Sequence, residues 1–206
     1  MTVGHLCPRK GVQSVLEIFK SLLEREENAR YVVVGGDGLE ARFSRHLRKM
    51  TCDLGLESVV TFTGGLDPRG VATWLRACDV FVLPTENEGC CNALLEAKAC
   101  NVPVVCSDVG GNREIVSGPA DRLIRVRDRD GLLRAVADVL SRSDRDGRIG
   151  SSETEVRTWE QVGKETLDSL QKAASEGMRA AEAVGEASAR LCSGPTAASI
   201  PSGLGR

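Results

Sequence analysis

The sequence predicts an α/β fold, a doubly wound parallel sheet with helices on both faces, followed by a C-terminal helix and a flexible tail. Short apolar runs typical of buried strands recur at residues 31–34, 59–63, 80–83, 102–106 and 123–126. Stretches of helical periodicity separate these runs. Parallel strands need such crossovers, and right-handed crossovers place helices over both faces of the sheet.

Each predicted element is marked by apolar spacing or by a glycine break. The first helix carries one apolar stripe, made of Val12, Val15, Leu16, Phe19, Leu22 and Leu23. The strand at 31–34 stops at a glycine-rich run, a helical pattern spans 39–54, and the strand at 59–63 stops at Gly64-Gly65. Further helices are expected around residues 71–78, after Asn92 and near 130–140.

The C-terminal part of the chain has a different composition. A last amphipathic helix is indicated by Trp159, Val162, Thr166 and Leu170, whereas residues 173–206 are rich in Ala, Ser and Gly with little periodicity. Such a segment buries too little apolar surface to offset the entropy of ordering. The sequence therefore predicts one domain over residues 1–172 and a flexible, low-complexity tail over 173–206.

Charge, hydropathy and cysteine spacing argue against several classes of protein. The 206 residues contain 27 Lys and Arg against 29 Asp and Glu, a formal charge of −2, so we expect no nucleic-acid partner. No window approaches the roughly 18 apolar residues of a spanning helix, and the N-terminus lacks a signal-peptide core. The eight cysteines lack metal-ligand spacing and are expected to be structural thiols. We expect a cytoplasmic protein without a membrane span, with peripheral attachment to a membrane through a partner as the alternative.

The loops that follow the strands form the predicted binding region. In a doubly wound sheet, ligands bind beyond the carboxyl ends of the strands, so these loops share one rim. They span residues 35–38, 64–67, 84–91 and 108–111.

Two glutamates on this rim have a spacing that suits a nucleotide. In ENEGCCNALLE, Glu88 lies in a loop and Glu96 about one turn into a helix that starts near Asn92. Amides at a helix start favour a diphosphate, and an ionised carboxylate accepts hydrogen bonds from two neighbouring ribose hydroxyls. Glu88 could then reach the group at the other end of the diphosphate. The alternative is a pair of solvated surface glutamates.

Lys10 adds a cation to the same rim. It lies in the segment PRKG, after a short first strand and before the first helix. An ammonium group there neutralises phosphate charge. The alternative is a solvated basic helix start.

Five separated segments resemble one known family. They are VGHLCPRKG near the start, VVVGGDGLE at 32–40, VTFTGGLDP at 60–68, DVFVLPTENEGCCNALLEAKACNVPVVCSDVGGNREIV at 79–116 and TWEQV at 158–162. Their order and spacing resemble the C-terminal, donor-binding half of a family 4 (group 1) retaining glycosyltransferase of the GT-B fold. The resemblance covers about residues 3–172.

The resemblance implies a Rossmann-like domain that binds a nucleotide-diphosphate sugar and serves glycosyl transfer with retention of anomeric configuration. By this resemblance Glu88 is the catalytic residue that supports charge at the reacting centre, Glu96 holds the ribose, and Lys10 binds the donor phosphates. The remaining donor-binding residues are Gly89, Cys90, Cys91 and Asn92, through their backbone, and Arg9. No cofactor and no metal are implied, because Lys10 and the helix start supply positive charge.

The chain departs from the family pattern at two places. His5 stands where the family commonly has an arginine that clamps phosphate, and Arg9 is a partial substitute. Cys90-Cys91 stands where Phe-Gly is usual, which puts a side chain where glycine permits close approach.

The resemblance also leaves alternatives open. Family members have a second, N-terminal domain that recognises the acceptor, and this chain starts near the first strand of the donor domain. We therefore expect a separate N-terminal acceptor-domain chain as partner, or a fragment of a longer gene. A non-catalytic nucleotide-sugar binding module is the alternative in function. A third hypothesis, a dinucleotide-dependent oxidoreductase, rests on the fit of residues 36–41 to G-x-G-x-x-A.

Overall fold

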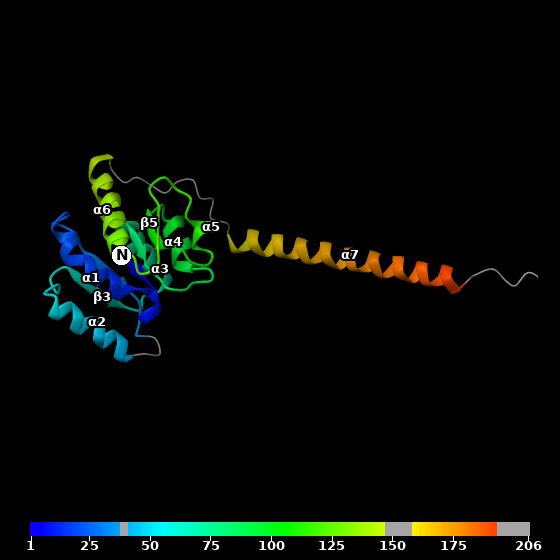
Figure 1. Ribbon diagram of the computed structural model, residues 1–206, viewed down its shortest axis with the longest axis horizontal. Helices are drawn as coiled ribbons and strands as arrows, with labels where there is room; N and C mark the ends of the chain where they lie inside the picture. Colours follow the sequence, from blue (N-terminus) through cyan, green and yellow to red (C-terminus); the bar gives the residue numbers. More distant parts are fainter. Residues whose placement is uncertain (38–40, 147–157, 193–206) are drawn as a thin grey trace, which may run out of the picture. The chain divides into compact units, whose positions relative to one another are not determined.

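The computed structural model describes residues 1–37, 41–146 and 158–192. The chain divides into two units, Met1–Val156 and Arg157–Arg206, and each is described by itself. The first unit is an α/β domain in which strands and helices alternate (Figure 1). The second contains one long helix.

The six strands in the described part of the α/β unit are all parallel and form two three-stranded ladders. One ladder has the order β1 (Thr2–Val3), β2 (Tyr31–Val34), β3 (Val60–Gly64). The other has the order β4 (Phe81–Leu83), β5 (Val104–Ser107), β6 (Arg122–Ile124). The predicted doubly wound α/β class is confirmed, with the chain building outward first on one side and then on the other.

The two ladders meet where β1 lies beside β4. The Val82 amide donates to the Met1 carbonyl at 2.8 Å, and the Thr2 hydroxyl donates to the Val82 carbonyl at 2.7 Å. Successive strands depart from this junction in opposite directions, so it is the topological switch point of the sheet. Ligands of doubly wound sheets bind at the carboxyl ends of the strands at this point.

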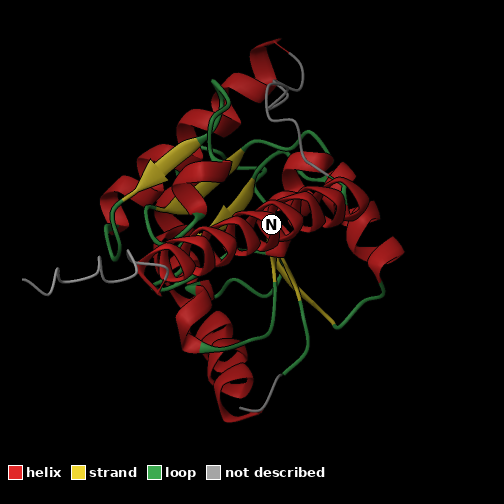
Figure 2. Ribbon diagram, turned by 90° about the vertical axis from the view of Figure 1, so that its right-hand side faces the viewer, coloured by secondary structure: helices red, strands yellow, loops and turns green. Residues whose placement is uncertain are grey.

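Helices cover both faces of the sheet, as Figure 2 shows. One apolar cluster contains Val33 and Val82 and is covered by α1 (Val12–Leu23) and α6 (Arg129–Asp146). The opposite cluster contains Phe81 and Leu83. It is covered by Leu75 of α3 (Pro68–Ala77) and Leu94 of α4 (Asn92–Ala99). The remaining elements are η1 (Pro8–Lys10), α2 (Ala41–Asp53) and α5 (Asn112–Ile115). Successive residues of a strand point to opposite faces of the sheet. Because helices bury both faces, nearly every residue of a central strand must be apolar.

A buried ion pair ties α4 to the second ladder. Lys98 of α4 donates to Asp121, just before β6, and both side chains are almost fully buried. Asp121 also accepts the Gly118 amide at 2.8 Å and the Val104 amide of β5 at 3.1 Å. The carboxylate therefore links α4, β5 and the turn before β6, and this fixes the helix whose start lies at the strand-end rim.

The second unit differs from the prediction. Helix α7 runs over Trp159–Cys192, so residues 173–192 are helical where a flexible tail was expected. Alanine is the best helix former, and it compensates for the weak apolar periodicity of this stretch. Residues 193–206, the end of the predicted tail, lie outside the described residues.

Candidate active site

Three loops that are distant in sequence meet at the switch point. They follow β1, β4 and β5 and span residues 4–11, 84–91 and 108–111. The Arg9 carbonyl accepts the Glu86 amide at 3.0 Å and the Thr85 hydroxyl at 2.9 Å, which joins the first two loops. The Gly111 amide donates to the Gly89 carbonyl at 2.9 Å and joins the second loop to the third.

Two glycines allow the loops to approach this closely. Gly11 has φ 71°, and a Cβ there would lie 2.2 Å from the Pro84 carbonyl oxygen. Gly110 has φ 51°, and a Cβ there would lie 1.7 Å from the Glu88 carbonyl oxygen. Any side chain at either position would collide with backbone and hold a strained conformation. The segment around Glu88 is thus fixed from both sides.

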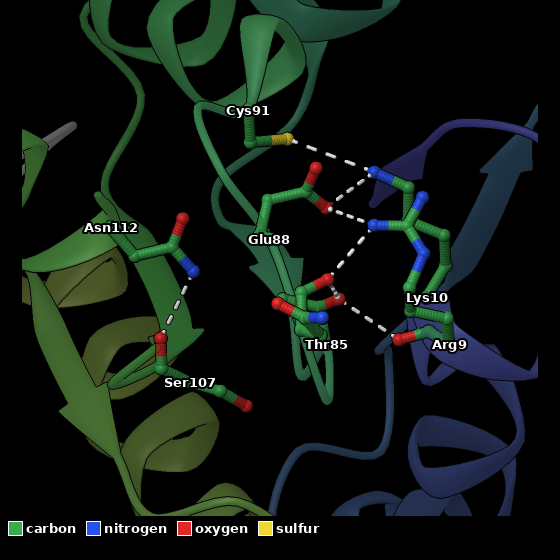
Figure 3. Close-up of polar contacts among 8 residues, drawn as sticks. Arg9, Lys10, Thr85, Glu88, Cys91, Ser107 and Asn112 are labelled. Atoms are coloured by element: carbon green, nitrogen blue, oxygen red, sulfur yellow. Dashed lines mark hydrogen bonds and ion pairs between the residues drawn. The ribbon is translucent and has the colours of Figure 1, made fainter. Parts of the chain in front are cut away.

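A charged pair lies at the centre of the three loops (Figure 3). Lys10 Nζ donates to Glu88 Oε2 at 2.8 Å, and Arg9 Nη1 lies 3.3 Å from the same oxygen. The side chains of Lys10 and Glu88 are 13% and 10% exposed. Neither is therefore a solvated surface group, which was the alternative interpretation of each residue from the sequence. The structure therefore brings together the two residues that the sequence predicted as catalytic and phosphate-binding.

Arg9 contacts the loop after β4. Besides approaching Glu88, its Nη1 donates to the Asn87 carbonyl at 2.8 Å, while nearly half of the side chain is exposed. The guanidinium thus holds the loop after β4 against the loop after β1. His5, two residues after β1, is exposed.

The start of α4 forms one wall of the site. Cys91 is the N-cap residue, makes no capping hydrogen bond with its side chain, and places its sulfur 4.0 Å from Lys10 Nζ. Free amides at a helix start carry partial positive charge. Together with Lys10 they make an environment that suits an anion. The predicted residues Gly89, Cys90 and Asn92 are exposed beside this helix start.

The two cysteines of this wall differ in exposure. Cys91 is 3% exposed, and burial raises the pKa of its thiol, with Lys10 acting in the opposite direction. Cys90 is exposed. None of the seven cysteines with described side chains forms a disulfide. A buried thiol with a raised pKa is protonated at neutral pH and is a poor nucleophile, so Cys91 serves as a wall of the site.

Glu96 lies one turn into α4 and apart from the charged pair. The structure shows no hydrogen bond or ion pair between the Glu96 carboxylate and any described residue. Burial raises the pKa of this carboxylate from its ordinary value of 4.5. The structure brings Lys10, Arg9, Glu88 and Cys91 into contact and leaves Glu96 on the same helix without a partner. An unpaired carboxylate is free to accept hydrogen bonds from a ligand.

Several site residues were not predicted. Thr85 is fully buried and binds two carbonyls, those of Arg9 and Asn87. Asn112 is also fully buried, and its side-chain amide donates to the Ser107 carbonyl at 3.0 Å. The available signal was that both are polar residues in or next to loops that follow predicted buried strands. In the loop over residues 108–111, the Gly111 amide is bonded to the Gly89 carbonyl and is not available to an anion.

Two other features of the described residues bear on the site. A cavity of about 750 Å³ opens at the opposite, amino-terminal edge of the strands, beside Met1, Tyr31 and Val80. Ligands of this sheet type bind at the carboxyl edge, so this cavity is not the candidate site.

In the described part of the chain, no three His, Cys, Asp or Glu side chains cluster closely enough to hold a metal ion, and no helix is long and apolar enough to span a membrane.

Comparison with known proteins connects this geometry with one family. Among curated proteins, D-inositol 3-phosphate glycosyltransferase 2 of Catenulispora acidiphila is 32% identical over 159 residues, which are 74% of this chain and 37% of that protein. The GDP-mannose-dependent alpha-(1-6)-phosphatidylinositol monomannoside mannosyltransferase of Mycobacterium tuberculosis is 30% identical over 82% of this chain and 46% of its own length. The chain thus spans less than half of these relatives.

Solved structures show the same fold. Sucrose-phosphate synthase of Thermosynechococcus elongatus superposes with a TM-score of 0.67 at 23% identity, over 84% of this chain and 45% of that one. The C-terminal domain of a glycosyl transferase group 1 family protein (LpcC) of Francisella tularensis superposes with a TM-score of 0.58 at 23% identity, over 70% of this chain and 74% of that one. The α/β unit therefore has the fold of the C-terminal domain of GT-B glycosyltransferases.

The family model described as glycosyl transferases group 1 matches residues 1–142, which include all of the predicted site residues. The match includes four of the five sequence segments that carry the resemblance, the segment at 158–162 lying beyond it, and the resemblance to the family is confirmed: this chain belongs to the group 1 glycosyltransferases.

Proposed function

We propose that this chain is the donor-binding half of a retaining glycosyltransferase and that it binds a nucleotide-diphosphate sugar at the switch point. The observation that carries the proposal is the Lys10–Glu88 pair, sheltered between three loops and next to the start of α4. A cation and a row of helix amides favour a diphosphate, and a carboxylate beside them faces the group that the diphosphate carries.

In the proposed reaction, the bond between the sugar C1 and the diphosphate oxygen breaks, and a bond between C1 and the oxygen of an acceptor hydroxyl forms on the same face. The proton of that hydroxyl passes to the departing diphosphate. Lys10 binds the departing diphosphate and stabilises the charge that develops on it. Glu88 lies within hydrogen-bond distance of Lys10 and supports the positive charge that develops at the sugar. Glu96, without a partner in the described structure, accepts hydrogen bonds from the ribose hydroxyls. The acceptor is bound by a second domain, which is either part of the same polypeptide or a separate chain that associates with this one.

The names of similar proteins narrow the donors to test. The mycobacterial relative is described as GDP-mannose-dependent, and one solved structure with this fold, Alr3699/HepE of Anabaena, was determined in complex with UDP. GDP and UDP are therefore the first nucleotides to compare, with ADP as a third.

Isothermal titration of the purified chain with UDP, GDP and ADP tests the proposal. We expect one nucleotide to bind, and Lys10→Ala and Glu96→Ala each to weaken its binding by about tenfold or more, since hydrogen bonds to charged groups contribute about 1.5–3 kcal/mol. Lys20→Ala, on the exposed side of α1, is the matched control and should not change the affinity. A chain shown to be folded that binds none of the three, or variants that bind as tightly as the parent, would overturn the proposal.

A non-catalytic nucleotide-sugar binding module is the second candidate. The observation in its favour is that His5, which is exposed, stands where the family commonly has an arginine that clamps phosphate. Both candidates predict nucleotide binding. Release of free sugar from the nucleotide sugar by this chain, or transfer when an acceptor domain is added, separates them, because a binding module produces neither.

A further inference from the structure

Helix α2 presents a basic face that the proposed donor site does not use. Its buried side is formed by Ser44, Leu47 and Thr51. Helical periodicity places Arg42, Arg45 and Lys49 on one stripe of the opposite side, and all three are exposed. In Figure 1, α2 lies at one edge of the α/β unit, next to α1 and β3.

The charge of this helix contrasts with that of the whole chain. Residues 41–53 contain Arg42, Arg45, Arg48 and Lys49 against Asp53, which gives +4 − 1 = +3, whereas the complete sequence has −2. The average over the chain therefore hides a concentrated basic surface.

The interactions within the fold do not account for all of these cations. Arg48 lies over the Phe62 ring at 4.9 Å, and Lys49 bonds Asp53 at 2.6 Å. In contrast, Arg42 and Arg45 form no ion pair with any described residue, and Arg45 Nε donates one hydrogen bond, to the Ala41 carbonyl of the same helix at 3.4 Å. Both lie near the start of the helix, where the macrodipole disfavours positive charge. Their presence costs the helix stability, and an external anionic partner would offset that cost.

The basic face lies close in the chain to the rim of the donor site. Helix α2 follows the loop after β2, and the Gly36 carbonyl of that loop accepts the Leu6 amide at 3.1 Å. Leu6 belongs to the loop that carries Lys10. Arg42 and Arg45 are in the half of α2 nearest to that loop.

We propose that the Arg42–Arg45 face of α2 binds the surface of an anionic lipid bilayer. The exposed face of a single helix is convex and forms no groove. It can still bind a flat bilayer, because each basic residue near an anionic membrane surface adds its own share to the binding free energy. A nucleic acid fits less well, since such binding comes from neutralising many phosphates at once. The inference rests on the proposed function and extends it, because binding to a membrane would bring the donor site close to a membrane-bound acceptor. Two curated relatives are named as mannosyltransferases of phosphatidylinositol mannosides.

Vesicle flotation of the full chain tests this inference without any nucleotide. The vesicles contain phosphatidylcholine alone or with ~30% phosphatidylglycerol, an amount that gives a negative surface potential. We expect binding only to the anionic vesicles, with a drop when salt is raised from about 0.1 M to about 0.5 M. The double substitution Arg42→Glu and Arg45→Glu should lower the partition coefficient by at least about tenfold.

The matched control changes the same amount of charge elsewhere. Arg76 on α3 and Arg134 on α6 are exposed and form no ion pair with a described residue, so Arg76→Glu with Arg134→Glu should leave vesicle binding close to that of the parent. Equal loss in both double variants, binding to neutral vesicles, or no binding by the folded parent would each overturn the inference. So would binding to a DNA duplex, but not to vesicles, that depends on Arg42 and Arg45. Nucleotide titration of the Arg42 and Arg45 variant reports separately on the donor site, so the two proposals can fail independently.

Discussion

Two lysine–carboxylate pairs in this domain have the same chemistry and different surroundings. Lys10–Glu88 lies at the strand-end rim with side chains 13% and 10% exposed, whereas Lys98–Asp121 is buried at 0% and 1%. Burial removes water from both charges of the second pair, and only excellent hydrogen bonding compensates for that loss. The first pair keeps access to solvent and to a ligand.

The hydrogen bonds of the two carboxylates differ in the same way. Asp121 accepts two backbone amides, from Gly118 and Val104, in addition to Lys98. The hydrogen bonds shown for the Glu88 carboxylate come from the side chains of Lys10 and Arg9, and both reach Oε2. A backbone donor cannot move without the fold, but long side chains can turn toward a new anion. The comparison teaches that the buried pair serves stability and the rim pair is free to exchange partners.

The strongest way to test this contrast is to remove the buried lysine. Lys98→Met should lower the free energy of unfolding by about 3–5 kcal/mol, because it leaves the Asp121 charge buried without its cation. Urea denaturation followed by circular dichroism measures the change. Lys20→Met, on the exposed side of α1, is the control and should change stability by less than about 0.5 kcal/mol. A loss below about 1 kcal/mol for Lys98→Met would remove the distinction between the two pairs.

The next test concerns the backbone that holds the rim pair. Gly110→Ala should lower the free energy of unfolding by about 2 kcal/mol and weaken nucleotide binding, because its Cβ would lie 1.7 Å from the Glu88 carbonyl oxygen at φ 51°. The same denaturation and titration experiments report both effects. Gly89→Ala is the stability control, since its Cβ would meet nothing within 4 Å. Equal stability of the two variants would show that the loop relaxes freely.

A smaller effect is expected when the rim carboxylate loses its charge. Glu88→Gln should tighten nucleotide-diphosphate binding by about threefold to tenfold, because Lys10 no longer has an ionic partner to give up, and a modest change in a charged hydrogen bond is of this size. Titration with the nucleotide that binds the parent measures it. Glu86→Gln is the matched control: Glu86 is in the same loop but pairs with Arg127 at 2.8 Å. Weaker binding by Glu88→Gln would mean that Glu88 helps to hold the nucleotide.

The sequence predicted the rim pair more successfully than the buried pair, and the reason is physical. Lys10 and Glu88 each follow a predicted strand, and the carboxyl ends of parallel strands meet at one edge, so their proximity follows from topology. Their direct hydrogen bond and the links through Thr85 depend on loop conformation, which apolar periodicity does not encode. Lys98 lies within α4 and Asp121 just before β6, so the topology of the strand ends does not bring them together, and the only signal was a lysine next to Ala97 on the buried stripe of α4.

The fold itself was predictable because its signals are long and repeated. Alternation of apolar strands and amphipathic helices was sufficient for the class and for the position of the rim, and the family match supports the resemblance found in the segments. The extent of α7 was not predicted, because helix propensity in an Ala-rich stretch acts without the apolar periodicity used to recognise helices.

Glu96 extends the comparison to a carboxylate without a lysine, and it gives the smallest expected effect. Burial raises its pKa above the ordinary 4.5, so the folded chain takes up this proton more readily than the unfolded chain. Its charge therefore opposes folding above that pKa, and this cost disappears as the pH falls through it. Ligand binding has the opposite dependence, because only the ionised form accepts both ribose hydroxyls. Nucleotide affinity should drop in the parent as the pH is lowered from about 7 to about 5, following this protonation, and should drop less in Glu96→Gln. Parallel pH profiles for the two proteins would assign the titration to another group and leave Glu96 without a role in binding.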